Sequence, residues 1–282
     1  MENLEYNFVK KNILALTGVD LSGYKSQQMQ RRLQTYLQRS NHSTWQSFFA
    51  AIRRDSTAVN KLRDYLTINV SSFFRDSEKF DYLRDNILPD LLNNRQTLRI
   101  WSAGCSRGYE PYSLAMMLAE LSGSHRQHYI LATDIDHSAL AWSQAGGPYT
   151  ADELANMPVA LQKRYFNLRN DRYYVTESLR GRITFRHHNL LADPFEQNFD
   201  LIVCRNVVIY FTTEVKDELY HRFSGALRPG GVLFVGGTEI VPKAAEIGLK
   251  TVGISFYRRG GTSEIPHTGG LSRPRAFGGR QI

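Results

Sequence analysis

Residues 98–104 read Leu-Arg-Ile-Trp-Ser-Ala-Gly, and residues 129–134 read Tyr-Ile-Leu-Ala-Thr-Asp. Both runs are mainly apolar, without the regular alternation of a strand that is exposed on one face. Helix-like segments follow them at residues 111–121 and 138–145. Runs of this kind are typical of parallel strands that are covered on both faces. They predict a doubly wound α/β domain.

The alternation of strand and helix continues toward the C-terminus. A helix is expected at residues 213–227, and further strands at residues 183–186, 199–204 and 231–235. No internal repeat accompanies this pattern. The α/β domain therefore extends at least to residue 235.

Residues 152–187 interrupt this pattern. A helical piece at 161–166 is followed by the polar, turn-prone stretch 167–171 and by Tyr-Tyr-Val-Thr at 173–176. Polar residues beside a short β-branched and aromatic run are typical of a hairpin. We interpret the interruption as a small insertion that contains a β-hairpin.

Residues 4–66 lack strand-like alternation and predict a bundle of about four helices. Thr44 and Asp55 each precede an apolar periodic segment and are expected to cap helix N-termini. The segment 67–75, Thr-Ile-Asn-Val-Ser-Ser-Phe-Phe-Arg, joins this bundle to the α/β domain. Two interpretations stay open: an aromatic linker anchored in the core, or polar side chains that project into a cleft between domains.

The distribution of charge limits the classes of function. The 282 residues carry 35 Lys and Arg against 27 Asp and Glu, a formal charge of +8. Residues 1–75 hold +6 and residues 258–282 hold +4, so the α/β region between them is slightly negative. A basic groove around an α/β site, which a nucleic-acid enzyme needs, is not indicated. The excess charge belongs to the N-terminal helices and the tail.

Other features of the composition indicate a soluble, reduced, cytoplasmic protein. No apolar run is long enough for a membrane span, and the polar N-terminus does not resemble a secretory signal. Two cysteines without CxxC spacing favour neither a disulfide framework nor a zinc site, and we expect no bound metal. Residues 260–282 hold six Gly and two Pro without apolar periodicity and are expected to be disordered.

A glycine-bearing turn and a strand-end carboxylate indicate a nucleoside site. Gly104 and Gly108 allow a sharp turn after the first strand, but their spacing fits neither dinucleotide nor NTP motifs. Asp134 ends the next strand, where a carboxylate can accept hydrogen bonds from ribose hydroxyls. The alternative for Asp134 is a helix cap, a role that Asp136 could equally fill. Together the two features favour a cofactor such as S-adenosylmethionine.

The segment Cys-Arg-Asn-Val-Val-Ile-Tyr-Phe at 204–211 leaves the carboxyl end of the strand at 199–204. Ligands of open α/β sheets bind at this edge, and Arg205, Asn206 and Tyr210 are costly to bury without partners. The segment lacks the Asn/Asp-Pro-Pro-Tyr run of amino-directed DNA methyltransferases. A site that modifies nucleic-acid bases is therefore disfavoured.

These segments, taken in order, resemble the CheR family of chemotaxis-receptor glutamate methyltransferases, most closely the members from Gram-positive chemotaxis systems. The similarity runs from about Gly18 to Arg258. Besides the segment 204–211, it includes Leu16–Leu21, Tyr24–Lys25, Gln28–Leu33, Asn69–Arg75, Trp101–Ser106, Glu110–Ser113, Ala132–Asp136, Asn189–Leu191 and Gly231–Gly236.

The resemblance implies an α/β fold: a Rossmann-like S-adenosylmethionine-dependent methyltransferase domain with a small antiparallel β insertion, preceded by an all-α N-terminal domain. We expect boundaries at 1–75 for the helical domain, 76–96 for a linker helix, 97–259 for the methyltransferase domain, about 152–187 for its β-subdomain, and 260–282 for the tail.

The resemblance also implies S-adenosyl-L-methionine as methyl donor, with S-adenosyl-L-homocysteine as product, and glutamates of methyl-accepting chemotaxis proteins as acceptors. The implied cofactor contacts are Asn69, Ser71, Arg75, Glu110, Asp134, Asn189, Leu190, Arg205 and Asn206. Arg75 and Tyr210 match the positions that orient the acceptor carboxylate and the methyl donor, and are the implied catalytic residues.

Two positions depart from the family pattern. Ser71 stands where Thr is usual and keeps the hydroxyl. Tyr109 replaces the first Glu of Gly-Glu-Glu-Pro-Tyr-Ser, whereas the second is retained as Glu110. We expect Tyr109 to affect the rim of the pocket.

Basic residues of the segment 25–39 are interpreted in two ways. Lys25, Arg32 and Arg39 recur every seven residues, which places them on one strip of a helix, with Arg31 nearby. They are either a solvated flank or, with acidic receptor helices as partners, a docking surface whose charge steers encounter. The hairpin insertion lacks the glycine-rich loop of relatives that tether to a receptor C-terminal peptide, so we expect no tether. We also expect a monomer.

Two other functions remain possible at this stage. One is a nucleic-acid methyltransferase, suggested by the basic charge, and the other is a non-catalytic signalling adaptor that binds a cofactor or nucleotide. Retention of Arg75, Asp134, Arg205, Asn206 and Tyr210 argues against the adaptor.

Overall fold

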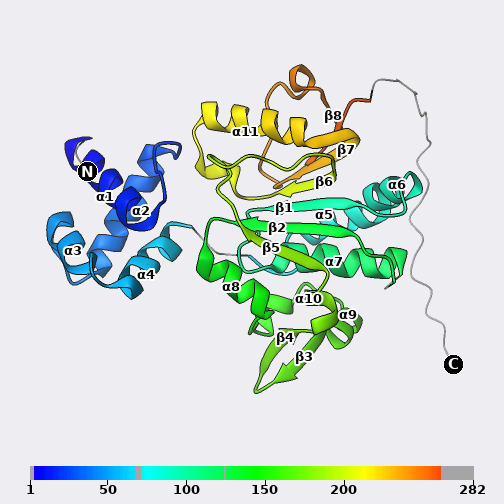
Figure 1. The fold of residues 1–282 in the computed structure, drawn as a ribbon, viewed down its shortest axis with the longest axis horizontal. Helices are drawn as coiled ribbons and strands as arrows, with labels where there is room; N and C mark the ends of the chain where they lie inside the picture. The colour runs from blue at the N-terminus through cyan, green and yellow to red at the C-terminus, as the bar shows by residue number, and fades with distance from the viewer. Residues whose placement is uncertain (1–2, 68–70, 124, 262–282) are drawn as a thin grey trace.

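The computed structural model describes residues 3–67, 71–123 and 125–261. In the N-terminal part of these ranges the chain forms a bundle, drawn in blue in Figure 1, of helices α1 (Asn3–Thr17), α2 (Ser26–Arg39), α3 (Trp45–Ile52) and α4 (Ser56–Leu66). Thr44 accepts the Ser47 N–H and Asp55 accepts the Thr57 and Ala58 N–H groups, which confirms both predicted caps. The bundle has its own core, which includes Met29, Leu33, Trp45, Phe48 and Phe49.

The second part of the chain is built on a seven-stranded sheet. Its strands are β1 (Arg99–Ala103), β2 (Tyr129–Asp134), β5 (Ile183–His187), β6 (Phe199–Cys204), β7 (Leu227–Val235), β8 (Leu249–Gly253) and β9 (Phe256–Arg259). They lie in the order β5-β2-β1-β6-β7-β9-β8. The first five are parallel, as predicted, and β9 runs antiparallel to both β7 and β8. The two antiparallel strands were not predicted, so the sheet is mixed.

Both faces of the sheet are buried. In β6, Leu201 and Val203 belong to one core, whereas Ile202 and Cys204 belong to another. The first core includes residues of α7 (Tyr109–Ser122) and of the continuous helical stretch α5 (Ser77–Tyr82), η1 (Leu83–Ile87) and α6 (Leu88–Asn93). The second includes residues of α11 (Thr213–Ala226). This two-sided burial explains the uniformly apolar strands of the sequence.

The remaining elements connect or border the sheet. Helix α8 (His137–Ala145) packs on β2 and β5. The short turns η3 (Val208–Tyr210) and η4 (Ala244–Ile247) follow β6 and β7. None of the helices in the described ranges combines the length and the apolar composition needed to cross a bilayer.

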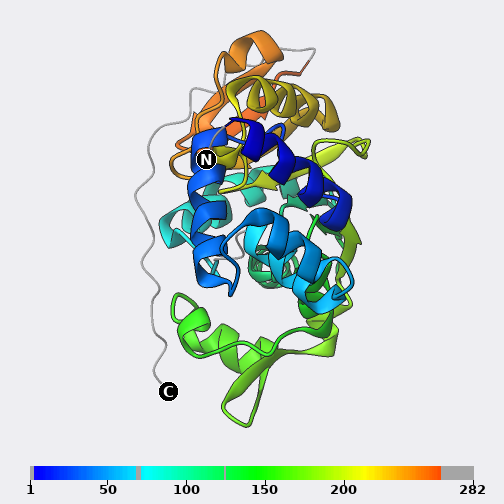
Figure 2. The same cartoon turned by 90° about the vertical axis from the view of Figure 1, so that its left-hand side faces the viewer.

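The predicted hairpin insertion is present. It consists of η2 (Asp152–Leu154), α9 (Val159–Tyr165), β3 (Phe166–Arg169), β4 (Arg172–Val175) and α10 (Glu177–Arg180). The strands β3 and β4 pair antiparallel and project from the molecule, away from the N-terminal helices, in Figures 1 and 2. Residues 167–169, which were assigned to the turn, belong to β3. The turn itself is only Asn170 and Asp171, whose φ angles of 48° and 55° suit these residue types.

The junction between the two parts is anchored at several points. Phe73 is fully buried, with its ring 5.2 Å from Tyr109 and 4.9 Å from Tyr149. The Thr67 hydroxyl donates to Asp136 Oδ2 at 2.7 Å. The aromatic half of segment 71–75 is therefore part of the core, as one of the two interpretations held. The domain boundaries remain a prediction, and residues 262–282 of the expected tail lie outside the described residues.

Phe73→Ala should lower the free energy of unfolding by about 3–5 kcal/mol, because it removes a buried ring from a cluster of aromatic contacts. Urea unfolding followed by circular dichroism measures this change. Leu168→Ala, at a side chain that is 60% exposed on the hairpin, is the control and should stay within about 0.5 kcal/mol of wild type. Equal effects of the two substitutions would contradict the anchoring role of Phe73.

Candidate functional site

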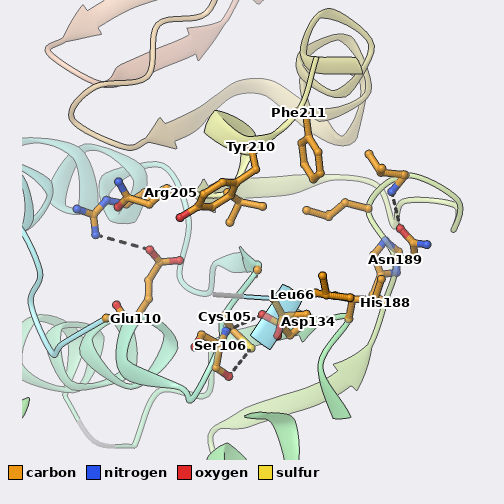
Figure 3. Close-up of a pocket in the computed structure, with 18 of the residues that line it drawn as sticks. Leu66, Cys105, Ser106, Glu110, Asp134, His188, Asn189, Arg205, Tyr210 and Phe211 are labelled. Atoms are coloured by element: carbon orange, nitrogen blue, oxygen red, sulfur yellow. Dashed lines mark hydrogen bonds and ion pairs between the residues drawn. The ribbon is translucent and has the colours of Figure 1, made fainter. Parts of the chain in front are cut away.

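A pocket opens at the carboxyl ends of β1, β2 and β6, which are neighbours in the sheet. Strand order reverses between β1 and β6, and in open α/β sheets such a reversal leaves a crevice for a ligand. The pocket encloses about 990 Å³ with its open mouth included (Figure 3). Tyr24, Leu66 and Thr67 of the N-terminal part complete its wall.

The glycine turn after β1 forms the floor of this pocket. Gly104 has a φ of 82°, and its N–H donates to the Thr133 carbonyl at 2.8 Å. A Cβ at Gly104 would lie 2.5 Å from Val207 Cγ2, in the loop after β6. Glycine is therefore required both by the backbone conformation and by the close approach of the next loop. Beyond it, Cys105 and Ser106 line the pocket.

Asp134 lies at the end of β2 and faces the pocket. Its Oδ2 accepts the Ser106 N–H at 2.7 Å and its Oδ1 accepts the Asp136 N–H at 2.9 Å. Burial raises the pKa of Asp134 to about 6, against the opposing effect of these backbone donors. Asp136, not Asp134, caps α8 by accepting the Ser138 and Ala139 N–H groups. The capping alternative for Asp134 is thereby removed.

Glu110 and Arg205 form an oppositely charged pair at one end of the pocket, and His188 and Asn189 lie at the opposite end (Figure 3). Arg205 Nη1 lies 3.7 Å from Glu110 Oε2, and the Ser102 hydroxyl donates to Glu110 Oε1 at 2.8 Å. Burial raises the pKa of Glu110, and Arg205 and Ser102 oppose this shift. Arg205 also binds Asp76 Oδ2 at 2.6 Å and the Arg75 carbonyl at 2.8 Å.

Three further predicted residues line the same pocket: Ser71, Arg75 and Tyr210. Ser71 and Arg75 flank the buried Phe73, so the polar half of this segment faces the pocket while its aromatic half lies in the core. Both interpretations of the segment are thus correct for different side chains. Asn69 lies outside the described residues.

Asn189, Leu190 and His188 form the wall that follows β5. Asn189 Oδ1 accepts the Leu191 N–H at 2.9 Å, which orients its amide group. Burial lowers the pKa of His188, so its ring is neutral near pH 7. This wall therefore offers an amide, an aliphatic side chain and an uncharged ring.

Asn206 completes the set of predicted contacts that line the pocket. All of them that fall in the described ranges converge here, although they come from distant parts of the chain. Sequence reasoning did not assign several others that also line it: Tyr24, Leu66, Thr67, Cys105, Ser106, Ile135, His188, Leu191, Val207 and Phe211. Most of these are sequence neighbours of an assigned residue, and this proximity is the feature that could have identified them from the sequence.

Tyr109 does not line the pocket, contrary to expectation. It is 2% exposed, packs against Phe73 and Tyr149, and donates its hydroxyl to Glu153 Oε1. The departure from the family pattern therefore affects the core beside the insertion.

Cys105 is a buried free thiol in the wall of the pocket. Its Sγ lies 3.7 Å from the Ser106 carbonyl oxygen. Burial raises the pKa of this thiol well above its ordinary value, and the nearby carboxylates of Asp134 and Glu110 raise it further. The sulfur is therefore protonated at neutral pH.

The basic residues of α2 do not share one environment. Lys25, Arg31 and Arg39 are exposed. Arg32 is half-buried, donates Nε to the Tyr65 carbonyl at 2.9 Å and lies over the Tyr65 ring. Burial lowers the pKa of Arg32. Arg32 thus also fastens α2 to α4.

The start of α2 adjoins the pocket directly. Lys25 and Arg32 line a small depression together with Tyr210. The Lys25 N–H donates to the Tyr210 carbonyl at 2.9 Å, and the Thr212 N–H donates to the Gly23 carbonyl at 2.9 Å. The basic helix therefore begins beside a predicted catalytic residue.

Comparison with known proteins agrees with this geometry. The family described as "CheR methyltransferase, SAM binding domain" matches residues 69–255, and "CheR methyltransferase, all-alpha domain" matches residues 4–67. A chemotaxis protein methyltransferase of Listeria monocytogenes is 40% identical over 90% of this chain and 96% of its own. Another, of Borreliella burgdorferi, is 34% identical over 85% and 91%. The chain therefore belongs to the CheR family of S-adenosylmethionine-dependent chemotaxis protein methyltransferases.

Proposed function

We propose that the pocket holds S-adenosyl-L-methionine and that the enzyme methylates glutamate side chains on the cytoplasmic domains of methyl-accepting chemotaxis proteins. When bound, S-adenosylmethionine supplies a methyl group that its sulfonium activates. The observation that carries the proposal is the distribution of charge in the pocket. Asp134 lies in the middle of the pocket, where hydroxyl donors fit, and the Glu110–Arg205 pair stands at one end, where an amino acid zwitterion fits (Figure 3).

The cofactor contacts follow from this match. The Asp134 carboxylate accepts backbone N–H groups, among them those of Ser106 and Asp136, and its remaining lone pairs suit ribose hydroxyls. Glu110 suits the amino group, and Arg205 with Asn206 suits the carboxylate of the methionine part. The adenine is assigned to Asn189 and Leu190. Asn69 and Ser71 keep their proposed contacts through the family resemblance alone.

Arg75 is assigned to the acceptor carboxylate, and Tyr210 is assigned to the geometry at the sulfonium of the methyl donor. A glutamate side chain is ionised at neutral pH, so no base is needed to prepare it. Arg75 would hold this carboxylate by charge-assisted hydrogen bonds, and Tyr210 would align it with the methyl donor. Catalysis then comes mainly from proximity and orientation.

Lys25, Arg31, Arg32 and Arg39 are proposed to receive acidic receptor helices. The exposed cations among them would steer encounter, while Arg32, half-buried against Tyr65, would hold α2 in place. This helix begins beside Tyr210, so a docked receptor would lie next to the pocket.

One assay tests the proposed function as a whole. Purified protein, radiolabelled S-adenosylmethionine and receptor-rich membranes should yield labelled membranes that release methanol in base. Label in nucleic acid, or absence of transfer despite cofactor binding, would contradict the proposal and support one of the two alternatives.

Arg75→Ala should slow formation of the receptor methyl ester by about 100-fold, because the acceptor carboxylate loses its oriented cationic partner. Initial rates at saturating cofactor measure the effect. Lys79→Ala removes another positive charge from the same region and is the matched control, expected to keep the wild-type rate. A wild-type rate for Arg75→Ala would show that the assignment is wrong.

Asp134→Asn should weaken cofactor binding by about 10- to 100-fold in titration calorimetry, because the amide offers one acceptor oxygen where the carboxylate offers two. Since the pKa of Asp134 is raised to about 6 in the free protein, wild-type affinity should fall as the pH drops below 6. Binding then requires release of a proton. The Asn variant should lose this pH dependence. An unchanged affinity would refute the ribose assignment.

The same raised pKa predicts the pH dependence of stability without cofactor. Because the pKa of Asp134 rises from 3.8 to about 6 on folding, the folded state retains the proton more strongly than the unfolded state does. The contribution of Asp134 to stability should therefore decline as the pH rises from about 4 to 6. Thermal melts of wild type and Asp134→Asn across this range measure the difference, and parallel curves would contradict it.

Charge reversal at Arg31 and Arg39 should raise the KM for receptor about tenfold at low salt, with kcat unchanged, because steering is lost while the pocket stays intact. Both side chains are exposed, so the bundle should keep its fold. The control is Arg54→Glu with Lys61→Glu, which changes the net charge equally at other exposed positions of the same bundle. Equal effects of the two pairs would indicate a nonspecific effect of net charge and contradict docking on α2.

A further inference from the structure

Glu239 is a buried carboxylate outside the residues considered so far. It follows β7 in a loop in which its neighbours Gly237, Thr238 and Ile240 are exposed, yet Glu239 itself is only 6% exposed. Its Oε2 accepts the Gly236 N–H at 2.6 Å and the Asn206 N–H at 3.0 Å. One oxygen thus joins the ends of two neighbouring parallel strands, β6 and β7.

The conformation of Asn206 gives this contact its importance. Asn206 has a φ of 58°, in the left-handed region that residues other than glycine adopt rarely. The bond to Glu239 fixes the N–H of this residue, and therefore the peptide that joins it to Arg205. Arg205 lies on the other side of this peptide, and its side chain reaches Asp76 and Glu110.

The surroundings of Glu239 also favour its ionised form. The Ile209 N–H, together with those of Gly236 and Asn206, favours the ionised form of Glu239 and opposes the rise in pKa that burial causes. Arg205 is a nearby cation that acts in the same direction. The carboxylate therefore holds the start of the loop that leads from Asn206 to Tyr210.

Gly236 provides independent support. A Cβ at this position would lie 2.6 Å from Glu239 Oε2 and 3.0 Å from the Asn206 nitrogen. Gly236 is not among the glycines with positive φ, so backbone conformation does not require glycine here. Glycine is favoured here because the Glu239 carboxylate packs closely against the backbone at both Gly236 and Asn206.

We propose that Glu239 is a positioning residue for methyl transfer, which sets the backbone at Asn206 and thereby places Arg205, and the loop that leads to Tyr210, in the cofactor pocket. The inference rests on the roles proposed above for these two side chains. It concerns hydrogen-bond geometry: the side chain needs an acceptor oxygen at the Oε2 position.

Glu239→Ala and Glu239→Gln separate this geometry from charge. Glutamine can keep an oxygen at the Oε2 position, whereas alanine leaves the N–H groups of Asn206 and Gly236 without their acceptor. We expect Glu239→Ala to weaken cofactor binding about tenfold and lower kcat at least tenfold. Glu239→Gln should stay within about threefold of wild type in both. Thr238→Ala, in the same loop but exposed, is the control and should match wild type.

Amide hydrogen exchange provides a measurement that does not depend on activity. Peptides covering residues 204–211 should exchange at least tenfold faster in Glu239→Ala than in wild type, with Glu239→Gln close to wild type. A general loss of stability would instead raise exchange across the sheet and leave the cofactor Kd of the folded fraction unchanged.

If Glu239→Ala does not fold, Glu239→Asp and Gly236→Ala replace it. The first withdraws the carboxylate by one methylene, and the second pushes a methyl group against it. Both should accelerate exchange in 204–211 and weaken cofactor binding. Wild-type exchange and affinity in the folded variants would overturn the proposal, and so would a Glu239→Gln variant as impaired as Glu239→Ala, since charge would then be the cause.

Arg205→Ala separates failure of this inference from failure of the proposed function. If Arg205→Ala binds cofactor normally, the role proposed for Arg205 is wrong. Faster loop exchange in Glu239→Ala would still support the contact with the backbone. If Arg205→Ala loses cofactor while Glu239→Ala retains both affinity and exchange protection, only the positioning role fails.

Discussion

The buried guanidinium of Arg205 is the interaction on which the arrangement of the pocket depends. Its side chain is 3% exposed and lies over the rings of Phe80 and Phe234, 5.2 and 4.8 Å from their centroids. A cation in such a place is stable only if carboxylates and carbonyls surround it. Asp76 and Glu110 supply the carboxylates, and they come from the segment before α5 and from α7. One residue thus ties the domain junction, a helix and the edge of the sheet together.

The contacts between the two parts of the chain give the pocket its second wall. Tyr24 and Phe211 form an isolated bridge, with ring centroids 5.0 Å apart, and Thr67 binds Asp136 beside the strand that ends in Asp134. Burial and the nearby Asp134 raise the pKa of the Tyr24 phenol to about 12, so it keeps its proton. The helical bundle that carries the basic α2 is therefore also part of the wall of the pocket.

The elements that could be predicted from the sequence are those whose residues are nearly all buried or follow one regular pattern of burial. The parallel strands were found because both faces of each, as with Leu201 and Ile202, are buried. The strands β8 and β9 were missed because polar and charged residues break their apolar runs. Lys250 and Thr251 are exposed in the edge strand β8, and β9 ends in Arg258 and Arg259. In the pocket, residues at strand ends such as Asp134 could be predicted, because ligands of open α/β sheets bind at the carboxyl ends of the strands. Glu239 could not be found in this way, because it acts on backbone N–H groups that any sequence would carry.

The buried thiol of Cys105 bears on which nucleophile is methylated. A thiolate is a far better nucleophile than a carboxylate, so a cysteine in the wall of a methyl-donor pocket invites self-alkylation. Here burial and two neighbouring carboxylates keep the sulfur protonated, and its Sγ lies within weak hydrogen-bond reach of the Ser106 carbonyl. The same low-dielectric surroundings that suit a cofactor therefore suppress its capture by the protein. In the proposed reaction, the proton that stays on the Cys105 sulfur therefore favours methylation of the acceptor carboxylate over methylation of the enzyme.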